Sequence, residues 1–356
     1  MAELFDTSHK GQLALNVLLV AAYLGLNSVL NLTNKWALGV YGFTFPLLLT
    51  TCHMAFSFCV LLPFMIREPF RSKHRDTLEK QWKGLLAIGI YMAANVSLNN
   101  LSLVLITLSL NQVIRSAIPV CTATLAIFIE KKIPTREEAT GLIVLTLGVM
   151  VAVWEGSVSG SVTGLLLCCA GTVCNAAMMS TAGKVMSEKV DVLRLTFYTA
   201  PVSCTVLLPL FLIRESQRFA VYWVDHSTGV LLVLVCSSIV ALSYNVIHSL
   251  MIQKTSAVTT TVLGEVKIVG LLLLSALLLG EKKAFTGKMT IGVTLAMIGF
   301  CMYSHTKLKS RPQPARTEDA ASSTKQARNV EEGTALLAEQ EPQPNTPTSA
   351  SLVHRS

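Results

Sequence analysis

Two cationic side chains lie inside long apolar stretches of the sequence. Arg115 lies within SLNQVIRSAIP, and Lys267 lies within TTTVLGEVKIVG. An ionisable side chain near the centre of a bilayer costs several kcal/mol unless it faces a partner or a wet cavity, so such residues point to a substrate path. Two cations at similar depth suit an anionic substrate such as phosphate.

Nearby charges leave alternatives open. Glu265 or Glu130 could neutralise one cation, or the long side chains could snorkel to an interface. Glu265 could also pair or couple a proton, unless it lies at the interface. Lys35, in SVLNLTNKW, either guards a vestibule or anchors the chain beside Trp36.

Several polar residues could hydrogen-bond a sugar or a base, although contacts between helices are their commoner use. They are Tyr244, Asn245, Asn95, Asn99, Asn111 and Gln112. His53 and His248 are isolated, and we expect packing or polar contacts from them. Because no His, Cys, Asp or Glu cluster has catalytic or metal spacing, we expect no enzyme, no metal and no cofactor.

The composition is that of a membrane protein, since 52% of the residues are hydrophobic and 14% charged, whereas soluble chains carry about 25% charged residues. A spanning helix needs about 20 apolar residues. Ten apolar runs fit, near 13–36, 44–66, 84–106, 109–129, 137–155, 160–182, 193–213, 228–250, 257–279 and 286–304.

The basic residues behind the net charge of +8 gather in short loops on one side of this arrangement. By the positive-inside rule, both termini are then cytosolic. No groove-reading or base-stacking motif accompanies the charge, so we expect no nucleic-acid partner.

An internal repeat organises the runs. Glu130-Lys131-Lys132, Gly141 and Gly148 recur as Glu281-Lys282-Lys283, Gly292 and Gly299, at a constant offset of 151 residues (130 to 281). Each half holds five helices, an odd number, so the second half enters the membrane from the opposite side. The sequence therefore predicts an all-α integral membrane protein of ten transmembrane helices in two inverted five-helix repeats.

The domains follow from this division: a cytosolic N-terminus (1–12), two repeats (13–155 and 160–304) and a tail (305–356). The tail is rich in Pro, Ser, Thr, Gln and charge, so we expect disorder. Its segment Glu332-Gly-Thr-Ala-Leu336-Leu337 fits an acidic dileucine sorting signal, a short pattern that also arises by chance.

Residues 13–309 resemble the triose-phosphate and nucleotide-sugar transporter branch of the drug/metabolite transporter superfamily. The segments that carry the resemblance are SVLNLTNKWALGVYGFTFPLLLTTCHM, SLNQVIRSAIPV and YNVIHSLMIQKTSAVTTTVLGEVK. The resemblance implies ten helices, cytosolic termini and strict exchange of phosphorylated substrates.

The plastid phosphate translocators of this branch place a tyrosine-asparagine pair before a lysine-arginine pair. Tyr244-Asn245 and Lys267 match by resemblance, Ile268 stands at the arginine position, and Arg115 matches a lysine that binds phosphate. A lone lysine is nearer the nucleotide-sugar members. We therefore expect an antiporter that exchanges a cytosolic nucleotide-sugar for a lumenal nucleoside monophosphate.

Two other functions remain as alternatives: an exchanger of triose phosphate or phosphoenolpyruvate for phosphate, and a non-transporting membrane scaffold that acts through its tail. The expected substrate-binding residues are Arg115, Lys267, Tyr244, Asn245 and Lys35. Expected partners are a phosphorylated small molecule and the lipid bilayer, with a homodimer left open. Without a transit peptide we expect the Golgi membrane, with the endoplasmic reticulum or an endosomal or vacuolar membrane as alternatives.

Overall fold

The computed structural model describes residues 2–154, 161–278 and 287–309, and these form helices and turns without a strand element. The elements are α1 (Ala2–Lys35), the π-helical turn η1 (Trp36–Val40), α2 (Pro46–Met65), the 3-10 turn η2 (Arg71–Lys73), α3 (His74–Leu105), α4 (Leu108–Arg115), α5 (Ile118–Ile129), α6 (Arg136–Val153), α7 (Val162–Ser187), α8 (Val192–Arg214), α9 (Ser216–Lys254), α10 (Ala257–Leu278) and α11 (Gly287–Lys309). Residues up to Thr306 form one compact unit, and a second unit begins at Lys307.

Two of the sequence predictions fall on other parts of the chain. The Glu281-Lys282-Lys283 junction and the tail with its dileucine-like segment lie outside the described residues. Among the described residues, the two predicted repeats can be compared at their glycines and their helices.

Among the described residues, eight helical segments are long and apolar enough to cross a membrane, as expected of an integral membrane α protein. They are Ala14–Leu38, Pro46–Met65, Arg71–Leu105, Leu110–Ile129, Val162–Ser187, Val192–Arg214, Ser216–Lys254 and Gly287–Lys309. The other two predicted runs overlap α6 and α10. The count of ten crossings stays a prediction.

The start of α6 is set by a local sequence signal, Thr-x-x-Glu. The Glu138 backbone N–H donates to Thr135 Oγ1 at 3.2 Å, and the Thr135 backbone N–H donates to Glu138 Oε2 at 3.0 Å. This capping box satisfies two amide groups that the first helical turn leaves without partners. It fixes where α6 begins, five residues before Gly141 (136 to 141).

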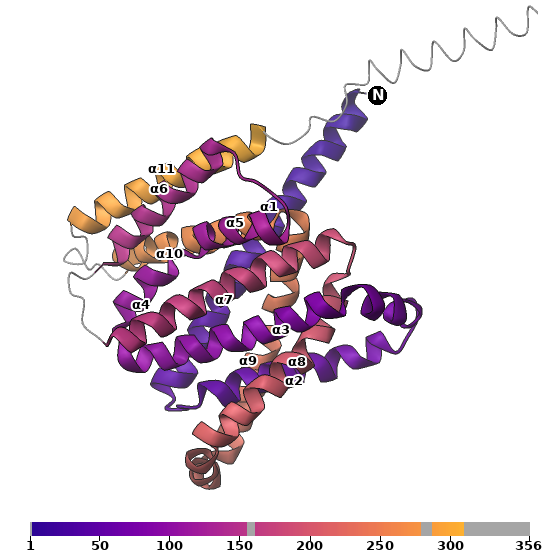
Figure 1. The fold of residues 1–356 in the computed structure, drawn as a ribbon, viewed down its shortest axis with the longest axis vertical. Coiled ribbons are helices and arrows are strands. Elements are labelled where there is room, and N and C mark those ends of the chain that lie inside the picture. The colour runs from indigo at the N-terminus through magenta and orange to yellow at the C-terminus, as the bar shows by residue number, and fades with distance from the viewer. Residues whose placement is uncertain (1, 155–160, 279–286, 310–356) are drawn as a thin grey trace, which may run out of the picture. The chain divides into compact units, whose positions relative to one another are not determined.

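The repeat glycines bring α6 and α11 into close contact, and the two helices run side by side in Figure 1. A Cβ atom added to Gly148 would lie 2.2 Å from the backbone nitrogen of Ala296 and 2.8 Å from the carbonyl oxygen of Gly292. No side chain fits at that distance, so only glycine permits this crossing.

The glycine on α11 makes the corresponding contacts with α6. A Cβ atom added to Gly299 would lie 2.2 Å from the backbone nitrogen of Leu145 and 2.8 Å from the carbonyl oxygen of Gly141. Each of these residues is offset by 151 from its counterpart around Gly148 (148 to 299, 145 to 296, 141 to 292). Adding 151 to the residue numbers of α6 therefore gives the residues of α11 that make the equivalent contacts.

The tight crossing supports α10. Val262 and Val269 are fully buried against a cluster formed by α6 and α11, which includes Leu145 and Ala296. The hydroxyl groups of Thr259 on α10 and Tyr303 on α11 lie 3.0 Å apart. One face of α10 is therefore held by the α6–α11 pair, which leaves another face for Lys267.

This crossing generates a stability prediction. We expect Gly148→Ala to lower the thermal unfolding temperature of the purified protein, because overpacking against backbone costs ~1–3 kcal/mol. The matched control is Gly25→Ala, since a Cβ atom at Gly25 would meet nothing within 4 Å. Equal unfolding temperatures for the two variants would refute the close packing.

Candidate substrate site

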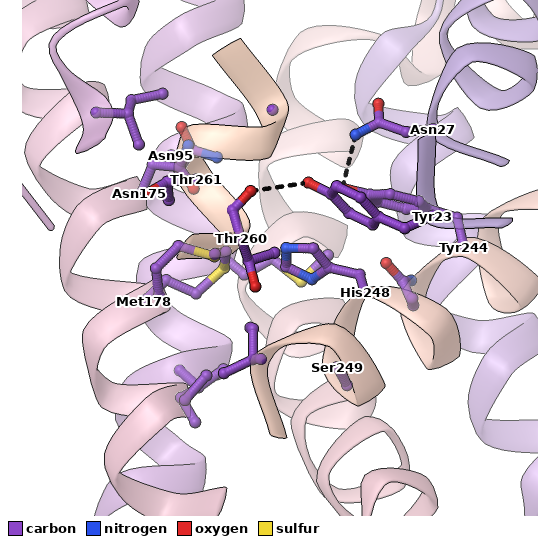
Figure 2. Close-up of a pocket in the computed structure, with 18 of the residues that line it drawn as sticks. Tyr23, Asn27, Asn95, Asn175, Met178, Tyr244, His248, Ser249, Thr260 and Thr261 are labelled. Atoms are coloured by element: carbon purple, nitrogen blue, oxygen red, sulfur yellow. Dashed lines mark hydrogen bonds between the residues drawn. The ribbon is translucent and has the colours of Figure 1, made fainter. Parts of the chain in front are cut away.

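A cavity of about 420 Å³ lies among the helices, and most of the predicted site residues line it. Arg115, Tyr244, Asn245 and Lys267 face this single space. Lys35 is the last residue of α1. Its side chain is not among those that the structure describes, so the substrate-binding role of Lys35 stays a prediction. Figure 2 shows part of the lining, with polar groups from several helices turned toward one another.

Arg115 stands where the helix breaks. The sequence predicts one helix over 109–129, but the structure has α4 ending at Arg115 and α5 beginning at Ile118. Pro119 explains the break, because it lacks the N–H that would otherwise bond the carbonyl oxygen of Arg115. Irregular backbone inside a membrane protein is tolerated where it is buried in protein or lines a cavity, and Arg115 and Ile118 on either side of the break line the cavity.

Amide oxygens surround the Arg115 guanidinium. Its Nη1 donates to Asn95 Oδ1 at 3.0 Å and to Asn99 Oδ1 at 3.3 Å. Asn111, which is 1% exposed, donates in turn to Asn99 Oδ1 at 3.1 Å. Neutral acceptors solvate the guanidinium but leave its positive charge uncancelled, so the charge remains available to an anion.

Lys267 has a similar partner on another helix. Its Nζ donates to Asn27 Oδ1 at 2.7 Å, and Asn27 Nδ2 donates to the Tyr244 hydroxyl at 3.4 Å. The second of these bonds is drawn in Figure 2. The chain from Lys267 through Asn27 to Tyr244 joins α10, α1 and α9 across the cavity.

In the described part of the chain, no carboxylate forms a direct ion pair with Arg115 or Lys267. Glu130 accepts hydrogen bonds from Lys132 Nζ at 2.7 Å and from Ser180 Oγ at 3.2 Å, away from the cavity. Glu265 lines the cavity, yet no ion pair within 4.0 Å joins it to Arg115 or Lys267.

An aromatic group forms another part of the lining. The ring centroids of Tyr244 and His248 lie 5.3 Å apart, and Tyr23 stacks on the two rings at 6.1 and 5.9 Å. The Tyr23 hydroxyl donates to the carbonyl oxygen of Thr260 at 3.3 Å, as Figure 2 shows. Aromatic faces beside cations suit a ligand with both a planar ring and phosphate groups.

Sequence reasoning missed part of this site. It did not identify Tyr23 and Asn27 as lining residues, and it expected packing or polar contacts from His248, although all three line the cavity. A signal existed, because Tyr23, Asn27 and Asn31 follow one another at spacings of four on α1 and so share one helical face. His53 does make the expected polar contact, with its Nε2 2.5 Å from Ser237 Oγ.

The chain is similar to several Arabidopsis thaliana proteins over most of its length. A probable sugar phosphate/phosphate translocator of Arabidopsis thaliana is 28% identical over 82% of this chain and 96% of its own. From the same plant, UDP-uronic acid transporter 1 is 28% identical over 86% of this chain and 99% of its own, and UDP-xylose transporter 2 is 30% identical over 76% of each.

A solved crystal structure shares the fold. It aligns with a TM-score of 0.60 at 14% identity, and the alignment covers 83% of this chain and 98% of that chain. The model of the Triose-phosphate Transporter family matches residues 13–304, a span that contains every residue that lines the cavity. The chain therefore belongs to the Triose-phosphate Transporter family, a family of membrane transporters.

Proposed function

We propose that this transporter is an antiporter that exchanges a cytosolic nucleotide-sugar for a lumenal nucleoside monophosphate by alternating access. The observation that carries the proposal is the cavity itself, where Arg115 and Lys267 face one space and bond only amide oxygens among the described residues. Phosphate groups are the ligands that such cations favour, because charge-assisted bonds to them are strong.

The cavity also suits a substrate larger than phosphate alone. Its volume of about 420 Å³ falls in the range of roughly 300–1,000 Å³ typical of small-molecule sites. The Tyr23, Tyr244 and His248 rings offer apolar faces, and amides such as Asn245 and Asn175 offer hydrogen bonds. Together they fit a base, a sugar and phosphate groups.

The choice between substrate classes depends on Ile268. This residue lines the cavity beside Lys267, at the position where the resemblance to plastid translocators implies an arginine. A small, doubly charged sugar phosphate favours a dense cluster of cations, and here a cation is replaced by an apolar side chain. Relatives named as UDP-xylose and UDP-uronic acid transporters support the nucleotide-sugar reading.

The second candidate is a sugar phosphate/phosphate exchanger. Its support is the name of the similar Arabidopsis thaliana protein, a probable sugar phosphate/phosphate translocator. The two candidates share the cations and differ in the counter-substrate, which would be inorganic phosphate in this case.

Alternating access requires two halves that can exchange conformations. The contacts of α6 and α11, which exchange under the 151-residue offset, support two inverted five-helix repeats. With ten crossings and the positive-inside rule, both termini would be cytosolic. We propose the Golgi membrane as the location, with other endomembranes as alternatives.

Counter-exchange in liposomes tests the proposal. Purified protein is reconstituted into vesicles preloaded with UMP, GMP, AMP, CMP or inorganic phosphate, and uptake of matching nucleotide-sugars or triose phosphate is measured. We expect uptake that depends on one internal nucleotide. Uptake driven by phosphate alone would support the second candidate instead, and no exchange with any pair would remove both.

Removing either cation should abolish this exchange. A hydrogen bond to a charged group is worth ~1.5–3 kcal/mol, so Arg115→Ala and Lys267→Ala should each reduce exchange at least about tenfold. Membrane insertion and yield should persist. The control is Arg75→Ala, because Arg75 is exposed and pairs only with Glu79 on its own helix among the described residues. Normal transport by either cavity variant would reject the assignment.

Restoring the missing cation should alter substrate preference. We expect Ile268→Arg to raise exchange of inorganic phosphate relative to nucleoside monophosphate, because a third positive charge favours the more compact anion. Ile268→Leu is the matched control and should keep the original ratio. An unchanged ratio in Ile268→Arg would show that this position does not select the substrate class.

A further inference from the structure

Glu265 is a buried carboxylate on the wall of the cavity. It precedes Lys267 by two residues on α10, its exposed fraction is 5%, and it lines the same space as both cations. None of the described residues donates a hydrogen bond to its Oε2. A buried carboxylate without its hydrogen bonds is costly, so this group calls for an explanation.

The charged and titratable groups that face Glu265 come from four helices. Arg115 on α4 and Lys267 on α10 attract its carboxylate electrostatically, while both keep amide oxygens as their hydrogen-bond acceptors. Tyr23 on α1 interacts electrostatically with Glu265, and Tyr244 and His248 of α9 line the same cavity.

The remaining elements add no charge to this space. The lining residues from α2, α3, α5, α7 and α8 include no Lys, Arg, Asp, Glu or His, and described residues of α6 do not line the cavity. Among the described residues, the charge of the cavity is therefore set by two cations and one carboxylate.

We propose that Glu265 binds one proton when the anionic substrate binds, so that the carrier takes up a proton together with its substrate. The proposal rests on the proposed function, because it requires a phosphate-bearing ligand at Arg115 and Lys267. It adds a proton site and a coupled ion to the exchange.

The empty and loaded carriers differ in what surrounds this carboxylate. In the empty carrier at a pH above the pKa of Glu265, the ionised carboxylate offsets one of the two positive charges. A bound phosphate group takes over that role and repels the carboxylate, which favours its protonated form. The proton comes from water and binds Oε2, and the new O–H can donate a hydrogen bond to a phosphate oxygen.

Linkage fixes the direction of the pH effect. If substrate binding favours protonation, protonation must favour substrate binding to the same extent. Affinity is then highest where Glu265 is protonated in both states, and it falls as pH rises, by up to about tenfold per pH unit for one linked proton.

The test measures protons taken up on binding by the full-length protein in lipid nanodiscs. Calorimetric titrations with UDP-xylose, GDP-mannose and CMP-sialic acid in turn are run in two buffers that differ in ionisation enthalpy. The phosphate groups of these compounds do not titrate near neutral pH, so buffer-dependent heat reports the protein. We expect uptake that approaches one proton per bound nucleotide-sugar and a dissociation constant that rises with pH.

The variant Glu265→Gln mimics the protonated carboxyl, so it should lose the proton uptake and the pH dependence together. The matched control, Glu79→Gln, removes an exposed carboxylate outside the cavity and should behave as the unmodified protein. Binding without proton uptake by the unmodified protein would overturn this inference and leave the proposed function intact. Failure of all three compounds to bind would overturn both.

Discussion

The cost of holding a positive charge in an apolar bilayer governs this structure. Arg or Lys at the centre of a spanning helix costs about 2.5–3.5 kcal/mol on insertion scales. Asn95 and Asn99 meet this cost for Arg115, and Asn27 does so for Lys267. Because amides solvate a cation without neutralising it, the cavity keeps its attraction for an anion. A carboxylate in direct contact with either cation would have stabilised the empty protein and opposed the ligand.

The framework that positions these cations is built from very small residues. Gly148 and Gly299 let α6 and α11 approach until backbone meets backbone, and the pair then holds Val262 and Val269 of α10. Lys267 lies between those two valines in the sequence, on the part of α10 that reaches the cavity. The crossing therefore sets both the position and the direction of a helix that lines the cavity, although Gly148 and Gly299 do not line it themselves.

Much of this could be predicted from the sequence, because long apolar runs and charges within them are local signals. A described helix or helix pair overlaps every predicted run, and Arg115 and Lys267 do line one cavity. Their binding role stays a prediction. The break after Arg115 was signalled by Pro119, but a proline alone does not tell a kink from a break. The Tyr23–His248 contact was beyond prediction, because it joins helices more than 200 residues apart, and such pairing depends on tertiary packing.

The proposed function depends on Arg115 and Lys267 both binding phosphate groups of the substrate. Its most direct test is a structure of the protein with a nucleoside monophosphate that supports exchange, and the measured quantities are the distances from the phosphate oxygens to the Arg115 guanidinium and to Lys267 Nζ. We expect phosphate oxygens within about 2.7–3.2 Å of both groups, with the bonds to Asn95 and Asn27 weakened or broken. A nucleotide bound elsewhere, with both cations still on their amide partners, would contradict it.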